Sequence, residues 1–220
     1  MSGGTGLLAG GTGPHANRPV ALAGAPLASA AAALILVHGR GGGPEDMLAL
    51  GRELAPPGMA LLAPEAAGHS WYPHRFIEPT ARNEPWLSSA LSVLADVLPR
   101  TGLPPEKVAV LGFSQGACLA LEFLARRRAP LGAAIGFSGG LIGDRLGPVP
   151  SEEVLAGMPV LLGCSRLDPH IPERRVLETE AHLRGLGAAV TTRLYPGGFH
   201  GVNQEEAALA RTLLATLTAG

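Results

Sequence analysis

The sequence predicts a single α/β domain with a mostly parallel sheet and helices on both of its faces. The length of 220 residues fits one domain of ordinary size. Hydrophobic residues make up 46% of the chain and the mean hydropathy is +0.24, which is enough for a core despite 31 glycines and 20 prolines. Short apolar runs alternate with segments of helical period, the pattern of strands joined by crossover helices.

Six short runs are either apolar almost throughout or rich in residues that favour strands, as expected of strands covered on both faces. They are 33–37, 59–63, 107–113, 132–137, 159–164 and 188–194. Neither an internal repeat nor a linker long enough to divide the chain is found between them. We therefore expect one domain over 20–220.

Five segments carry the helical period, in which apolar residues recur at i, i+3, i+4 and i+7. They are 45–55, 84–98, 115–127, 172–186 and 204–217. Asn83 is the expected N-cap of the second helix and Pro99 its end, while Asn203 and Glu206 form a capping-box pattern before the last one. The irregular stretches 65–82 and 139–157 are too short for a large lid domain.

Charge and cysteine content limit the partners. Lys and Arg total 17 against 18 Asp and Glu, so the net charge of -1 argues against a nucleic-acid partner. Cys118 and Cys164 are too few for a disulfide framework or a zinc site, which favours a reduced, cytoplasmic protein. Whether these two cysteines meet is left open, and we expect no metal or organic cofactor.

The N-terminal segment raises the question of export. Residues 1–19 are rich in glycine and predict a flexible leader. Residues 20–37 carry no charge and could be taken for a signal peptide. They are largely alanine, contain Gly24 and Pro26, and lead directly into a glycine-rich motif, so we expect neither a membrane span nor export.

Residues 112–116, Gly-Phe-Ser-Gln-Gly, match the G-x-S-x-G motif. A predicted strand leads into the motif and a predicted helix leaves it. So sharp a turn strains the serine backbone and projects its hydroxyl above the sheet edge. Ser114 is therefore the predicted nucleophile.

A second G-x-S-x-G match occurs at 136–140, around Ser138. The ten residues that follow contain two glycines and two prolines, so no helix can begin there. A nucleophile elbow also uses the N-terminus of the next helix to stabilise an oxyanion. Ser138 is expected to end a strand near the site.

A serine nucleophile needs a histidine base and a carboxylate that orients it, here in the chain order serine, acid, histidine. Asp168 follows a predicted strand, whereas Asp144 lies in an irregular stretch. His200 lies in a glycine-rich loop between the last strand and the last helix, and His170 is its competitor. The remaining histidines outside the glycine-rich motif are expected to be solvated: His15, His69, His74 and His182.

The motif His-Gly-Arg-Gly-Gly at 38–42 lies between a predicted strand and a predicted helix. Its exposed N–H groups suit an oxyanion hole, formed by the backbone of Arg40 and of Gln115. The motif could instead begin a dinucleotide fingerprint, but Pro44 stands where the third glycine belongs. We expect His38 to hold this loop by hydrogen bonds.

Together these motifs resemble the α/β-hydrolase superfamily, and within it the phospholipase/carboxylesterase family that includes the acyl-protein thioesterases. Four motifs carry the resemblance: 38–42, 112–117, 168–169 and 199–201. It extends from about residue 20 to the C-terminus. It implies a compact α/β-hydrolase fold, a triad of Ser114, Asp168 and His200, and an oxyanion hole at Arg40 and Gln115.

The substrate pocket transfers least from the family. Many members have an apolar residue at the position of Arg40, and Trp-Phe-Asp where this chain has Trp-Tyr-Pro at 71–73. Trp71, Tyr72 and Phe76 follow the carboxyl end of a strand, where they could line an acyl or aryl pocket or simply pack the loop. The expected opposite wall contains Leu141 and Ile142.

These observations predict a serine carboxylesterase that cleaves short-to-medium acyl or aryl esters through an acyl-enzyme. A thioesterase or lysophospholipase with the same mechanism is the alternative, followed by a non-catalytic binding protein on a hydrolase scaffold. The expected partner is a small-molecule ester. The oligomeric state, including a homodimer, is left open.

Overall fold

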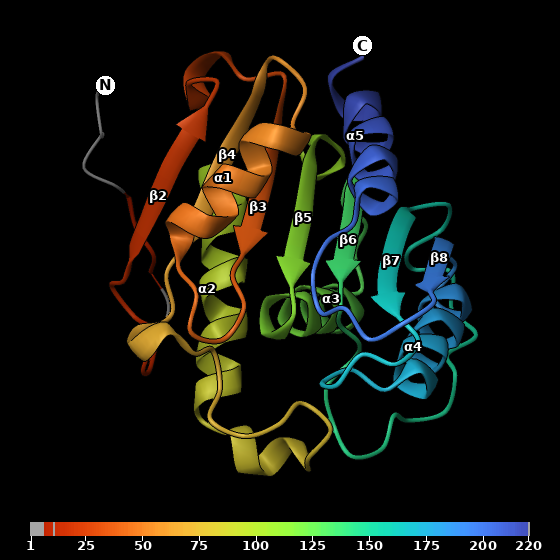
Figure 1. Ribbon diagram of the computed structural model, residues 1–220. Helices are drawn as coiled ribbons and strands as arrows, with labels where there is room; N and C mark the ends of the chain where they lie inside the picture. The colour runs from red at the N-terminus through yellow and green to blue at the C-terminus, as the bar shows by residue number, and fades with distance from the viewer. Residues whose placement is uncertain (1–6, 11, 220) are drawn as a thin grey trace.

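A computed structural model describes residues 7–10 and 12–219 and places eight strands of this part of the chain in one sheet (Figure 1). The strand order is β1-β2-β4-β3-β5-β6-β7-β8. The β1–β2 and β2–β4 pairs are antiparallel, and every other pair is parallel. The strands are β1 Leu7–Leu8, β2 Pro19–Gly24, β3 Ala32–Val37, β4 Met59–Pro64, β5 Val108–Phe113, β6 Ala133–Phe137, β7 Pro159–Ser165 and β8 Ala189–Tyr195.

Helices cover both faces of the sheet. Helices α1 and α5 pack on one face, in front in Figure 1, and α2, α3 and α4 pack on the other. Their bounds are α1 Pro44–Leu54, α2 Trp86–Arg100, α3 Gln115–Arg127, α4 Glu173–Gly185 and α5 Gln204–Thr218. The predicted α/β-hydrolase fold is confirmed, and both irregular stretches remain loops that contain at most short 3-10 turns.

The N-terminal part differs from the prediction of a flexible leader over 1–19. Within it, Leu7–Leu8 pairs with β2, and the side chain of His15 is fully buried. Residues 1–6 lie outside the described part of the chain. The uncharged segment 20–37 supplies most of β2 and all of β3, and no helix among the described residues is long and apolar enough to cross a membrane.

The start of α2 was also predicted wrongly. The helix begins at Trp86, and Asn83 does not cap it, because its side-chain oxygen instead accepts the backbone N–H of His74 at 2.8 Å. Pro99 lies inside the last turn of the helix and does not end it. By contrast, the capping box of Asn203 and Glu206 forms as predicted, with hydrogen bonds of 2.9 and 2.7 Å.

Candidate active site

Ser114 lies in the sharp turn between β5 and α3, with φ 54° and ψ -118°. This backbone conformation is strained for a residue with a side chain and is typical of a nucleophile elbow. A Cβ on Gly116 would lie 2.0 Å from the carbonyl oxygen of Val37, so only glycine allows α3 to approach β3 this closely. The Ser114 N–H donates to the carbonyl of Phe137 at 2.9 Å, which fixes the backbone at this turn.

The structure brings Ser114, His200 and Asp168 together. His200 Nε2 is 2.9 Å from Ser114 Oγ, and His200 Nδ1 is 2.7 Å from Asp168 Oδ2. An ionised carboxylate only accepts, so Nδ1–H donates to Asp168 and Nε2 accepts the serine hydroxyl. His170, the competing base, lies edge-on to the His200 ring with 4.8 Å between their centroids.

Asp168 is held in a strong hydrogen-bonding environment. Its Oδ1 accepts the backbone N–H groups of His170 and Ile171, at 2.8 and 3.0 Å. Burial raises the pKa of the Asp168 carboxyl, but the hydrogen bonds from His200, His170 and Ile171 outweigh it and hold the pKa below its ordinary value. The carboxylate therefore stays ionised against His200. Asp144, the alternative acid, is exposed and belongs to another loop.

The loop after β3 lies beside the elbow. A Cβ on Gly39 would be 3.4 Å from Ser114 Cβ, and Arg40, Gln115 and Ser114 line one cavity. Within residues 7–10 and 12–219, the backbone N–H groups of Arg40 and Gln115 have no hydrogen-bond partner. As predicted, His38 holds this loop: its Nε2 accepts the N–H of Ala66 at 3.1 Å, so its Nδ1–H donates to the Gly39 carbonyl at 2.8 Å.

The side chains of Arg40 and Gln115 have a further task, which the sequence did not reveal. Arg40 donates to Ser70 Oγ and the Tyr72 carbonyl, both at 2.8 Å, and to the His74 carbonyl at 3.0 Å. Gln115 donates to the Tyr72 carbonyl at 2.8 Å and accepts from the backbone of residue 71 at 3.0 Å. The two side chains thus fix the 70–74 loop over the elbow. The arginine within the glycine-rich motif at 38–42 was the one available signal.

His15 also holds this loop through hydrogen bonds. It is buried, so the expectation that it is solvated is wrong. Its Nδ1 accepts the N–H of Ala67 at 3.0 Å, and its Nε2–H donates to the carbonyl of Trp71 at 2.9 Å. Burial lowers the pKa of both His15 and His38. Both imidazoles are therefore neutral parts of the scaffold.

The cavity next to Ser114 has a volume of about 360 Å³. Of the predicted pocket residues, Tyr72 and Phe76 line it. Ile171 and His170 also line it, although the sequence did not assign them to the pocket. Its complete lining is Gly39, Arg40, Tyr72, His74, Arg75, Phe76, Phe113, Ser114, Gln115, Cys118, His170, Ile171 and His200.

Trp71, Leu141 and Ile142 do not line this cavity, so their predicted placement is wrong. Trp71 is fully buried, where its Nε1–H donates to the carbonyl of His38 at 2.9 Å and its ring packs between two histidines. The backbone N–H groups of Leu141 and Ile142 bind side chains of α4 and α3 at 2.9 Å. All three residues build the loops that surround the site.

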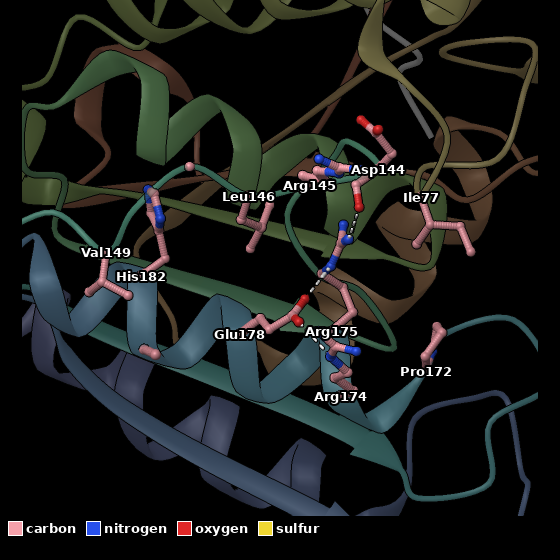
Figure 2. Close-up of a pocket in the computed structure, with 12 residues that line it drawn as sticks. Ile77, Asp144, Arg145, Leu146, Val149, Pro172, Arg174, Arg175, Glu178 and His182 are labelled. Carbon is pink, nitrogen blue, oxygen red and sulfur yellow. Dashed lines mark hydrogen bonds and ion pairs between the residues drawn. The ribbon is translucent and has the colours of Figure 1, made fainter.

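A second and larger pocket, of about 640 Å³, lies between α4 and the 144–149 loop (Figure 2). Arg175 crosses it and donates to the carbonyls of Leu141 and Gly143 at 2.8 and 2.7 Å, while its Nε contacts Glu178 at 3.0 Å. The residues that line this pocket include neither serine nor cysteine. We therefore assign this pocket to the anchoring of a loop, and Ser114 remains the predicted nucleophile.

The two cysteines do not meet as a disulfide. Both are free and buried, and burial raises the pKa of the Cys118 and Cys164 thiols to about 12. A thiol of this kind is protonated at neutral pH and is a poor nucleophile. Ser138 follows β6 and is fully buried, as expected for a residue that ends a strand.

The sheet, its helices and the strained serine at the carboxyl edge define an α/β-hydrolase. The chain belongs to the phospholipase/carboxylesterase family, whose sequence profile matches residues 23–218. It is therefore an enzyme, a hydrolase of carboxylic esters. This family membership argues against the interpretation as a non-catalytic binding protein.

Three relatives illustrate this similarity. A phospholipase/carboxylesterase from Dyadobacter fermentans is 34% identical, with a TM-score of 0.86 over 94% of this chain and 100% of that chain. Esterase PE8 is 27% identical, with a TM-score of 0.72 over 91% and 98%. Acyl-protein thioesterase 1 of Gibberella zeae is 32% identical over 112 residues, which are 48% of this chain and 46% of that protein.

Proposed function

We propose that this hydrolase cleaves short-to-medium acyl or aryl carboxylic esters through an acyl-enzyme on Ser114. His200 Nε2 takes the hydroxyl proton while Oγ attacks the ester carbonyl, and the Asp168 carboxylate stabilises the resulting imidazolium. The N–H groups of Arg40 and Gln115 stabilise the oxyanion. His200 then protonates the leaving alcohol and activates the water that releases the acid.

The observation that carries this proposal is the continuous pair of hydrogen bonds from Ser114 through His200 to Asp168, 2.9 and 2.7 Å long. A serine becomes a competent nucleophile when a histidine accepts its proton and a carboxylate orients that histidine. The small size of the adjoining cavity, about 360 Å³, supports short-to-medium acyl groups.

The test compares hydrolysis of p-nitrophenyl acetate and butyrate by the wild type, Ser114→Ala and Ser138→Ala. Loss of a triad nucleophile costs about 10⁶-fold in kcat, so Ser114→Ala should be inactive. Ser138 is a matched control, since it is the serine of the second G-x-S-x-G motif and is buried away from the cavity. Full activity of Ser114→Ala, or loss of activity only in Ser138→Ala, would contradict the assignment.

A thioesterase or lysophospholipase is the second candidate, and the acyl-protein thioesterase relative favours it. The mechanism is the same, so only the substrate distinguishes the two. The kcat/KM values for matched oxygen and thiol esters of butyrate, compared in one preparation, decide between them.

A cytoplasmic location and a homodimer stay predictions. Light scattering tests the homodimer.

A further inference from the structure

The cavity beside Ser114 is one-sided in charge. Apart from His200, its ionisable basic side chains belong to Arg40, His74, Arg75 and His170, and no aspartate or glutamate lines it. The nearby carboxylate of Asp168 is fully buried behind His200 and is already bound to it. A concave site lined by charge of one sign focuses the electrostatic potential and attracts the opposite charge.

This positive charge is not neutralised locally, in contrast to most arginines of the protein. Ten arginines form ion pairs with carboxylates within the described residues. Arg40 and Arg75 are not among them. The guanidinium of Arg40 donates only to neutral oxygens, two carbonyls and one hydroxyl. These hydrogen bonds fix its position without cancelling its charge.

Arg75 is the cation best placed to contact a ligand. Its backbone carbonyl accepts the N–H of Glu78 at 3.1 Å and the side-chain amide of Asn83 at 3.4 Å, which fix the chain at this point. Its side chain is exposed and, among the described residues, has no ion-pair partner. A guanidinium of this kind is suited to bidentate binding of a carboxylate.

His170 lines the same cavity as Arg75. The lining includes the 74–76 segment and residues 170–171, and the ring of His170 lies edge-on to that of His200. An imidazole N–H is a hydrogen-bond donor to carboxylate oxygens. Arg75 and His170 therefore both offer donors to an anionic group bound in the cavity beside Ser114.

We propose that the natural substrate is an ester that carries a carboxylate close to the scissile bond, bound by Arg75 together with His170. This inference rests on the proposed function, since it names the substrate class of the same site. The carboxylate can belong to the acid part, as in a dicarboxylic monoester, or to the alcohol part, as in an ester of a hydroxy acid. Both sources share the same recognition chemistry.

The experiment compares two matched substrate pairs. The mono-p-nitrophenyl ester of glutarate and p-nitrophenyl valerate differ in the charge of the acid part. The butyrate ester of para-hydroxybenzoate and its methyl ester differ in the charge of the alcohol part. For each pair, the ratio of kcat/KM for the anionic to the neutral ester is measured in the wild type, in Arg75→Gln and in Arg52→Gln. Arg52 is the control, an exposed arginine of α1 outside the cavity.

We expect one of the two ratios to fall about threefold to fivefold in Arg75→Gln, the size of a partly exposed ion pair, mainly through a higher KM for the anionic ester. Arg52→Gln should match the wild type. The same ratio in the wild type should fall with added salt. The pair whose ratio responds identifies the part of the substrate that carries the charge.

The outcomes separate this inference from the proposed function. Equal losses on anionic and neutral esters in Arg75→Gln would mean that the basic lining serves only the oxyanion, and would overturn the inference. Unchanged ratios in both pairs would do the same. In either case, hydrolysis of the neutral esters that depends on Ser114 would leave the proposed function intact. Absence of Ser114-dependent hydrolysis of every ester would reject the proposed function itself.

Discussion

At the residue scale, the geometry around Asp168 makes a sharp prediction. Replacement by Asn keeps the shape but puts an amide where the carboxylate accepts Nδ1–H, so His200 can switch to the tautomer that cannot accept the proton of Ser114. We expect kcat for p-nitrophenyl butyrate to fall about 10⁴-fold in Asp168→Asn.

The matched control for this change is Asp144→Asn. Asp144 is the other aspartate that follows Ser114 in the chain, but it is exposed and lies in the loop of Figure 2. Its carboxylate contributes nothing to His200, so the variant should keep wild-type kcat. A comparable loss in both variants would show that Asp168 has no special place in the reaction.

The structure brings the three residues of the predicted triad together but places several of their predicted neighbours elsewhere. Ser114, Asp168 and His200 each stand in a local motif whose position in the order of strands and helices limits where the side chain can lie. The role of Trp71 depends on His15 and His38, which are distant in the chain. Local pattern shows that a tryptophan follows a strand, but not whether it faces the cavity or two buried histidines.

At the scale of elements, the contact between α3 and β3 positions Ser114. A Cβ at residue 116 would meet the carbonyl oxygen of Val37 at 2.0 Å, and backbone on both sides leaves no side chain that could move aside. Gly116→Ala must therefore push the helix from the sheet. We expect a loss of about 2–4 kcal/mol in the free energy of unfolding, together with lower kcat.

Urea unfolding measures this loss, and Gly147→Ala is the control, because a Cβ at that position meets nothing within 4 Å. If Gly116→Ala were as stable and as active as Gly147→Ala, the close approach of the two elements would not be required. The glycines of the motif would then have another explanation.

Strands and helices with a clear period were predicted within a few residues of their observed bounds, and the failures have physical causes. Strand β2 was missed because its alanine- and glycine-rich sequence has low intrinsic strand preference, and pairing with β4 imposes the structure. The helix from Trp86 was started too early because Asn83 is a good cap in isolation. Its side chain is engaged by the backbone of residue 74.

At the scale of the whole molecule, buried neutral histidines connect stability to pH. Burial lowers the pKa of His15 and His38 in the folded protein below the ordinary value of 6.5, and each ring accepts a backbone N–H that protonation would expel. Below pH 6.5 the unfolded chain therefore binds protons that the folded protein does not. The free energy of unfolding should fall as the pH drops from about 6.5, by up to about 1.4 kcal/mol per pH unit for each histidine.

Other groups also connect stability to pH, so the contribution of one histidine has to be isolated. Burial raises the pKa of Glu206, which opposes the loss on acidification because the folded protein takes up this proton more readily.

Urea unfolding at pH 7.5 and 5.5 gives the acid-induced loss in the free energy of unfolding for each variant, and the comparison removes terms that the variants share. His15→Gln should lose about 1 kcal/mol less than the wild type between these two pH values. Arg52→Gln, an exposed substitution on α1, is the control and should lose as much as the wild type. Equal losses in all three proteins would mean that His15 takes up its proton as easily in the folded protein as in the unfolded chain.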